Sequence, residues 1–227
     1  MYMSRARLNL VAAKNSKFWQ NLGNNYQIHN MIWSLFADKP ERARDFMYRQ
    51  EEINGFPTFY IVSGRKPDDQ SGLWSVESKL YEPALRTDQK LSFVLRANPI
   101  VSKRDENGKQ HRHDVIMDAK SQLKRDGISK DKYPRVSEIV QKKGVEWLQR
   151  KGQMNGFEIE GDQVRADGYQ TQKLYKPKGK HHVNISTIDF TGVLTVTETE
   201  LFKKALYYGV GPAKGFGCGL ILVRPVR

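Results

Sequence analysis

The spacing of apolar residues near the start of the chain predicts a strand followed by a helix. Residues 3–10 have the composition of a strand with polar interruptions, and an asparagine-rich polar stretch follows them. From Ile28 to Phe36, apolar side chains recur every three or four positions, which is the spacing of an amphipathic helix. Pro40 ends this pattern, because the residue before a proline is disfavoured in helical conformation.

Strand-like sequence follows this helix. Residues 46–50 and 58–63 suit the two strands of a hairpin, and Asn54-Gly55 between them tolerates the positive φ angles of a tight turn. Residues 73–80 form a weak segment, and residues 91–96 predict a further strand. The first part of the chain therefore runs strand, helix, two strands, a weak segment and a strand.

The second half of the chain repeats this alternation. Helical spacing covers residues 137–150 and 198–208, and the strand candidates are residues 156–166, 169–176, 183–196 and 220–223. Two βαββαβ halves fit this order, each an antiparallel sheet covered by helices on one face, so the fold class is α+β. We place the boundary near residues 97–100, which gives domains of residues 1–97 and 98–227. The duplication rests on element order alone, because the halves share no sequence repeat.

The charge of the chain makes a polyanion the expected partner. The 227 residues include 38 Lys and Arg against 25 Asp and Glu, a net charge of +13 with a pI near 9.7. With 38% apolar residues, the chain is globular rather than a basic disordered tail. Residues 99–227 hold 24 Lys and Arg against 15 Asp and Glu, so the second half carries most of the basic surface.

The cysteine content and the apolar runs exclude several classes of protein. One cysteine, Cys218, excludes an internal disulfide framework and a multi-cysteine zinc site. No apolar run approaches the roughly 18 residues that a bilayer span needs. Residues 1–5 begin no signal-peptide core. We therefore expect a cytoplasmic protein that does not contact a membrane.

Two basic stretches are candidate nucleic-acid contacts. Their cationic residues are Lys103, Arg104, Lys109 and Arg112 in the first, and Lys173, Lys176, Lys178 and Lys180 in the second. The second stretch holds no acidic residue and lies between strand-like segments. It is either a solvated hairpin tip or a β-hairpin that enters a nucleic-acid groove, and the net charge favours the latter.

Tyr26 and His29 lie three residues apart on one helix face. A phenol beside an imidazole can bind and transfer protons, but such a pair is more often a structural hydrogen-bonding pair. Four other histidines lie among cations, as His111, His113 and the pair at 181–182. Neighbouring cations repel a metal ion and no carboxylate cluster completes a site, so we expect no metal and no other cofactor.

Glycine is concentrated between the last helix and the last strand, at residues 209–219. Glycines let backbone amides approach a phosphate closely, and the candidate contacts here are Gly211, Lys214, Gly215 and Gly217. The alternative is a helix-to-strand turn with special backbone conformation. A dinucleotide fingerprint follows a strand and opens a helix, and the reverse order here argues against a nucleotide-using enzyme.

The sequence GVGPAKGFGCGL at residues 209–220 resembles the loop that closes the repeat-associated RNA-binding (RAMP) proteins of CRISPR systems. Four further segments are similar to CasE-type CRISPR repeat endoribonucleases, and they are YQIHNMIWSLF at 26–36, FVLRANP at 93–99, VEWLQR at 145–150 and FTGVLT at 190–195. These segments cover the chain from end to end in the family's order.

This resemblance implies two tandem ferredoxin-like domains, which are similar to RNA recognition motif domains. It also implies an endoribonuclease that cuts precursor CRISPR RNA at the base of the repeat stem-loop without a metal ion. The enzyme would then stay on the mature crRNA beside the other Cascade subunits. The family's catalytic pair corresponds to Tyr26 and His29, and attack by the RNA 2′-hydroxyl would leave a 2′,3′-cyclic phosphate and a 5′-hydroxyl. The alternative is a non-catalytic RNA-binding subunit of a ribonucleoprotein, which needs neither residue.

Overall fold

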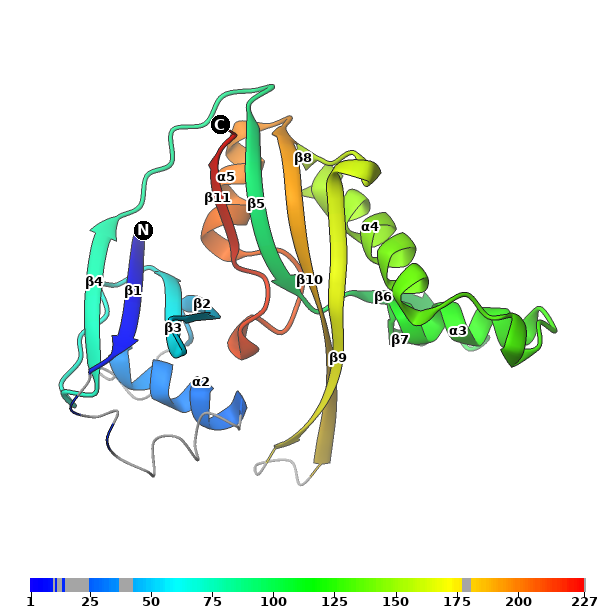
Figure 1. Cartoon of the computed structure of the whole chain (residues 1–227), viewed down its shortest axis with the longest axis horizontal. Coiled ribbons are helices and arrows are strands. Elements are labelled where there is room, and N and C mark those ends of the chain that lie inside the picture. The colour runs from blue at the N-terminus through cyan, green and yellow to red at the C-terminus, as the bar shows by residue number, and fades with distance from the viewer. Residues whose placement is uncertain (10, 12–13, 15–24, 37–42, 177–180, 227) are drawn as a thin grey trace.

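The described part of the chain forms two main sheets with helices against them and a separate two-stranded sheet (Figure 1). The computed structural model describes residues 1–9, 11, 14, 25–36, 43–176 and 181–226. The first sheet is antiparallel and has the order β2-β3-β1-β4. Its strands are β1 (Tyr2–Leu8), β2 (Phe46–Ile53), β3 (Phe56–Ser63) and β4 (Trp74–Leu80). The helix α2 (Asn25–Trp33) and the 3-10 turn η2 (Ser34–Phe36) join β1 to β2.

The second sheet has the order β11-β5-β10-β8, with β9 also paired to β10. Its strands are β5 (Lys90–Ala97), β8 (Phe157–Glu158), β9 (Val164–Lys176), β10 (His181–Val196) and β11 (Ile221–Pro225). Its helices are α3 (Val115–Arg125), α4 (Val136–Met154) and α5 (Thr199–Tyr208). The turns η3 (Lys130–Lys132), η4 (Gly161–Gln163) and η6 (Lys214–Phe216) complete the domain, with the hairpin of β6 (Ile100–Arg104) and β7 (Gln110–Asp114).

Each sheet buries one apolar face. Ile28 and Ile32 of α2 are buried together with Phe59 and Ile61 of β3 in one core. The second and larger core joins α4 and α5 to the strands through residues such as Trp147. Burial of apolar surface contributes roughly 25 cal/mol per Å², so these two faces fix the positions of the helices on the sheets.

The first sheet places β4 beside β1 and β3 between β1 and β2, and the second sheet likewise places β11 beside β5 and β10 between β5 and the edge strands β8 and β9. This strand order confirms the predicted pair of βαββαβ sheets. The first unit lacks the second helix, because residues 64–73 connect β3 to β4 without a helix. The predicted hairpin is confirmed, and its turn residues Asn54 and Gly55 have φ angles of 54° and 78°.

The predicted domain boundary differs from the sheet pairing. The sequence pattern places the strand at residues 91–96 in the domain of residues 1–97, but β5 pairs with β10 and β11 in the second sheet. The fourth strand of the first sheet is instead β4, from the segment that has only a weak pattern. β5 buries alternate residues, Leu91, Phe93 and Leu95, in the second core, and this long-range pairing leaves no local signal. The change between sheets therefore falls at residues 81–89 rather than after residue 97.

Two other features of the second unit differ from the predicted pattern. The first basic stretch forms the hairpin β6-β7 and leads into α3, neither of which the apolar spacing predicts. The strand candidate at residues 156–166 is divided by η4 into β8 and the start of β9. α3 is largely exposed, with Val115 and Ile116 as its buried residues, so its apolar signal is short.

The hairpin of β9 and β10 is the longest pair of strands in the described part of the chain. In Figure 1 it runs past the end of the second sheet toward the level of α2. Its described pairing ends at Lys176 opposite His181. The two sheets also meet directly, because Met47 and Val62 of the first sheet form a small core with Leu220. The segment between α5 and β11 thus lies against the first domain.

Candidate active site

His29 is on the side of α2 that faces the glycine-rich segment. Its ring centroid lies 5.7 Å from that of Trp33, 6.4 Å from Phe46 and 6.0 Å from Phe216. The imidazole is half-buried, and its Nδ1 has no hydrogen-bond partner among the described residues. The structure therefore brings a helix of the first domain and a loop of the second domain together at one histidine.

Tyr26 lies one turn before His29 in α2. The backbone of Tyr26 is helical, and its side chain is outside the described residues. Residues three apart on a helix are neighbours on one face. The predicted pairing of these two residues on α2 therefore agrees with the described backbone, and the role of the phenol stays a prediction.

The glycine-rich segment reaches His29 because several of its residues adopt left-handed backbone conformations. Gly211 and Gly217 have φ angles of 79° and 77°, and Ala213 has a φ of 60°. Side chains disfavour this region, so the turn needs glycine at most such positions. Gly215 has no such backbone requirement, and an added Cβ there would be in ordinary contact with the imidazole, 3.4 Å from Cε1 of His29. The segment thus presents its backbone to the imidazole.

Two cations flank this contact, Lys214 of the loop and Arg44 just before β2. Neither makes an ion pair with a carboxylate of the described residues, and Nη1 of Arg44 donates to the carbonyl of Phe46 at 2.9 Å. Burial lowers the pKa of Lys214, and the charge of Arg44 lowers it further. Burial also lowers the pKa of Arg44. Two half-buried cations without a counter-ion among the described residues form a site that favours an anion.

The environment of His29 keeps its imidazole neutral. Burial lowers the pKa of His29, the carbonyl of Gly215 opposes this, and the charge of Arg44 lowers the pKa further. The carbonyl of Gly215 does not form a hydrogen bond of standard geometry with Nδ1. A neutral imidazole has one nitrogen that can accept a proton, which is the requirement for a general base near neutral pH.

Tyr48 of β2 contacts the glycine-rich loop and helps to hold it in place. Its hydroxyl donates to the carbonyl of Gly215 at 3.2 Å, and an added Cβ at Gly217 would lie 3.4 Å from its ring. Burial raises the pKa of Tyr48 well above its usual range, so the phenol stays a donor. Sequence reasoning missed both Tyr48 and Arg44. Neither belongs to a motif, although Arg44 is a cation placed directly before a buried strand.

The predicted RNA contacts are distributed over three places. Gly211, Lys214, Gly215 and Gly217 lie in the loop, where Gly211 packs on Trp147. Lys173 is exposed on β9 opposite Asn184 of β10. The side chain of Lys176 and the whole of Lys178 and Lys180 lie outside the described residues.

The third place is the hairpin β6-β7, which carries Lys103, Arg104, Lys109 and Arg112. In Figure 1 this hairpin and α3 lie at the far end of the second domain from α2. Lys103 pairs with Asp118 at 2.6 Å, and His111 pairs with Asp105 at 2.8 Å. The structure therefore does not bring this group together with His29.

The described residues contain no group of three or more His, Cys, Asp or Glu side chains that could hold a metal ion. His111 and His113 neighbour each other on β7 with ring centroids 6.4 Å apart. The side chains at positions 181 and 182 are outside the described residues. No helix in the described part of the chain has the length and apolar character that a bilayer crossing requires.

Comparisons with known proteins agree with this arrangement over nearly the whole chain. The model of a family described as CRISPR associated protein matches residues 1–225. The Cascade subunit CasE of the CRISPR system of Escherichia coli (strain K12) is 31% identical over 203 residues, which are 88% of this chain and 92% of that protein. The CRISPR-associated endoribonuclease Cse3 of Thermus thermophilus is 26% identical over 222 residues, 91% of this chain and 92% of that protein.

A solved structure extends the likeness to three dimensions. Thermus thermophilus Cse3 bound to an RNA that represents a pre-cleavage complex has a TM-score of 0.68 to this chain at 25% identity. That likeness covers 99% of this chain and 98% of the other. The match of the family model to residues 1–225 and the 31% identity to CasE together show that this chain belongs to the family of CRISPR-associated proteins.

Proposed function

We propose that the chain is an endoribonuclease that cleaves precursor CRISPR RNA at the base of the repeat stem-loop. It then stays on the crRNA as a subunit of Cascade. The relatives support this function, because one is named a Cascade subunit and another an endoribonuclease that has been solved with RNA. The net charge of +13 suits a polyanionic substrate.

The observation that carries the proposal is the position of His29 beside two cations without counter-ions among the described residues. A scissile phosphate next to His29 would lie within the electrostatic influence of both Lys214 and Arg44. Cations that face developing negative charge stabilise the pentacoordinate transition state of phosphate ester cleavage. The loop backbone at Gly215 and Phe216 forms the wall of this position.

The chemistry needs a base, a positioned nucleophile and charge stabilisation. We assign His29 as the base that takes the proton of the 2′-hydroxyl, because burial lowers the pKa of its imidazole. Its Nδ1 is buried beside Gly215, so Nε2 is the nitrogen that accepts this proton. Tyr26 orients the hydroxyl or donates to a phosphate oxygen, since an unperturbed phenol is a poor base near neutral pH. The attack breaks the bond between phosphorus and the 5′-oxygen, which takes up a proton from water, and it leaves a 2′,3′-cyclic phosphate and a 5′-hydroxyl. The mechanism assigns no step to a metal ion.

The hairpin of β9 and β10 is the proposed grip on the RNA stem. It extends from the second sheet toward the level of α2 (Figure 1), and Lys173 is exposed on it. Lys176, Lys178 and Lys180 continue the same basic stretch. A-form RNA hides its base edges in a deep, narrow groove, so these lysines would contact phosphates rather than bases. Lys103, Arg104, Lys109 and Arg112 are a second and more distant set of phosphate contacts.

Incubation of the protein with its cognate repeat stem-loop in excess EDTA tests this function. The expected result is one cut at the base of the stem, with a cyclic phosphate on the upstream product. An RNA of the same composition without a stem is the control and should stay intact. Tight binding without any cut would instead support the non-catalytic RNA-binding subunit. A cut that appears only after magnesium is restored would contradict the mechanism.

A further inference from the structure

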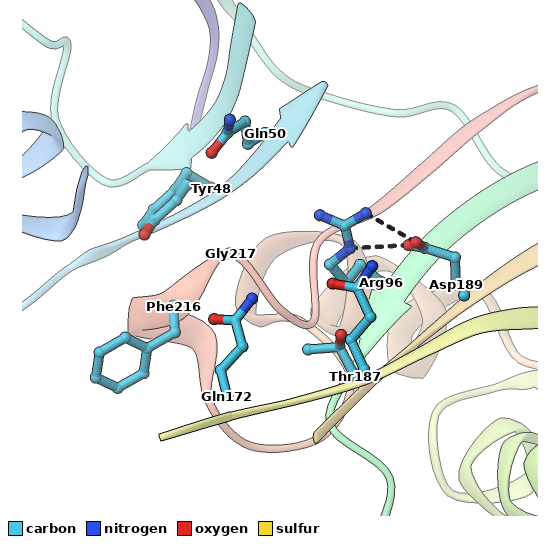
Figure 2. A pocket seen from close by; sticks show the side chains of 10 residues that line it. Tyr48, Gln50, Arg96, Gln172, Thr187, Asp189, Phe216 and Gly217 are labelled. Carbon is cyan, nitrogen blue, oxygen red and sulfur yellow. Dashed lines mark hydrogen bonds and ion pairs between the residues drawn. The ribbon is translucent and has the colours of Figure 1, made fainter. Parts of the chain in front are cut away.

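A small polar cavity lies on the other side of the glycine-rich loop from His29. Its volume is about 60 Å³, and its walls come from β2, β5, the hairpin β9-β10 and the loop. Figure 2 shows Tyr48 and Gln50 on one side of it and Gln172 and Thr187 on the other. Phe216 and Gly217 separate the cavity from the active site, and Phe216 also packs against the His29 ring at 6.0 Å.

The ion pairs at the cavity leave it without a net charge. Arg96 lies in its wall and donates to Asp189 through Nε at 2.9 Å and Nη2 at 2.7 Å, as the dashed lines of Figure 2 show. Behind Asp189, the guanidinium of Arg49 is only 5% exposed and pairs with Glu51. The Nη2 of Arg49 lies 3.7 Å from Oδ1 of Asp189. Two guanidinium groups face two carboxylates, so the cavity suits a neutral ligand rather than a phosphate.

The remaining polar groups can recognise such a ligand by hydrogen bonds. Gln50 and Gln170 line the cavity, and their side chains make no hydrogen bond within the described residues. Each amide offers two donors and one acceptor oxygen, and Thr187 adds a hydroxyl. Paired donors and acceptors on amide side chains match the edges of nucleobases, as the bidentate contact of glutamine with adenine illustrates.

The size and place of the cavity restrict which group of an RNA can enter. A volume of about 60 Å³ admits the polar edge of one base, while the ring faces stay outside. The phosphates are charged, which leaves base edges and ribose hydroxyls as the neutral groups of RNA. Several amides converging from two domains suit the edge of a base better than a single hydroxyl. Phe216 and Tyr48 belong to both the cavity and the active-site wall, so the base belongs to a nucleotide close to the scissile phosphate.

We propose that this cavity binds the hydrogen-bonding edge of one unpaired nucleobase next to the scissile phosphate and so sets base preference at the cleavage point. The inference rests on the proposed endoribonuclease function and adds a subsite to it. Gln50 and Gln170 contact the base, and the ion pair of Arg96 with Asp189 keeps the cavity rigid and neutral. Binding of this base holds the adjacent phosphate against Lys214 and His29.

Abasic substrates test the proposal. Two stem-loop RNAs each carry one abasic nucleotide, on the 5′ or on the 3′ side of the scissile phosphate, with sugar and phosphate intact. Single-turnover cleavage by the wild-type protein should fall about tenfold or more at one of these positions, which is the discrimination of a bidentate amide contact. The double variant Gln50→Leu/Gln170→Leu should cut the normal RNA and that abasic RNA at rates within about twofold of each other.

The control variant also loses two glutamine side chains, but at positions outside the cavity. Gln153 and Gln163 are exposed and outside the cavity, so Gln153→Leu/Gln163→Leu should keep the full abasic effect. Equal cutting of all three RNAs by the wild type would overturn the base-binding site and leave the endoribonuclease function intact. An abasic effect that survives in Gln50→Leu/Gln170→Leu would also overturn it. If the wild type does not cut the unmodified stem-loop, the proposed function falls and this inference falls with it.

Discussion

The two described basic regions differ in how far their cations are buried. At the active site, Lys214 and Arg44 are half-buried and have no carboxylate partner within the described residues. At the hairpin β6-β7 the four cations are exposed. Lys103 pairs with Asp118, and Arg104, Lys109 and Arg112 make no ion pair among the described residues. Exposed ion pairs contribute little to stability or recognition, whereas an uncompensated cation in a half-buried site favours binding of an anion. Burial of the cations therefore distinguishes the candidate active site better than the number of cations in the sequence.

The largest expected effect is on the cleavage rate, which should depend on His29 of the candidate site and not on His113 of the hairpin β6-β7. His29→Ala should lower the single-turnover cleavage rate by at least about 10²-fold with nearly unchanged RNA affinity, because it removes the base and few RNA contacts. His113→Ala on β7 is the matched control and should keep the wild-type rate. Rates are measured with gel-resolved, labelled stem-loop RNA and affinities by filter binding. Full activity of the His29 variant would remove this residue from the mechanism.

The next effect tests whether the loop positions the imidazole. An added Cβ at Gly215 would lie 3.4 Å from Cε1 and 3.6 Å from Nδ1 of His29, so alanine fits in ordinary contact. Gly215→Ala should therefore cleave at nearly the normal rate. The two methyl groups of Gly215→Val require the ring to move, and the rate should fall by roughly 10-fold to 10²-fold. Equal rates for the two variants at equal melting temperature would show that the contact does not position His29.

A comparison of paired substitutions tests the role of the cations. The double variant Lys214→Gln/Arg44→Gln should bind RNA more weakly. The slope of log affinity against log salt should become less steep by about 0.7 to 0.9 for each phosphate that is no longer neutralised. The cleavage rate at saturating protein should also fall, because the proposed mechanism uses both cations to stabilise the charge on the reacting phosphate. Lys103→Gln with Arg104→Gln should leave that rate unchanged. A slower rate in the second pair and a normal rate in the first would reverse the proposed difference between the regions.

The smallest effect is a shift in pH dependence. Because burial and Arg44 lower the pKa of His29, the neutral base persists below the ordinary histidine pKa of about 6.5. The acidic limb of the cleavage profile should thus have its midpoint below that value. Arg44→Gln removes a cation that disfavours the imidazolium, so the midpoint should move upward. The midpoint is read from single-turnover rates across pH, and a downward movement in the variant would contradict this account.

The helices α2, α4 and α5 and the hairpin of β2 and β3 could be predicted from the sequence, because they follow local patterns. The spacing from Ile28 to Phe36 marks α2, and Asn54-Gly55 marks the hairpin turn. The domain boundary could not be predicted from the sequence. It depends on the sheet that β5 joins, and β5 pairs with β10, which is distant along the chain. The exposed hairpin β6-β7 and α3 lack the long apolar pattern that marks buried elements.

The site shows the same division between local and long-range information. Helix spacing and resemblance singled out His29, and the glycine-rich composition of the loop singled out Lys214 and Gly215. The structure places Gly215 against His29, and Lys214 precedes Gly215 in the loop. Arg44 and Tyr48 reach the site from the start of β2 and belong to no motif. Their roles depend on the contact between the first sheet and the glycine-rich loop, and residue spacing within one segment carries no information on that contact.

The nucleophile is the most direct test of the central claim that this site cleaves RNA by attack of its own 2′-hydroxyl. A stem-loop RNA with a single 2′-deoxyribose on the 5′ side of the scissile phosphate lacks that group and keeps the phosphates and bases. In EDTA, the wild-type protein should bind this RNA with normal affinity and leave it uncut under conditions where the all-ribose RNA is fully cleaved. Cleavage of the deoxy-substituted RNA at the normal rate would mean that water attacks, and it would contradict the roles assigned to His29, Lys214 and Arg44.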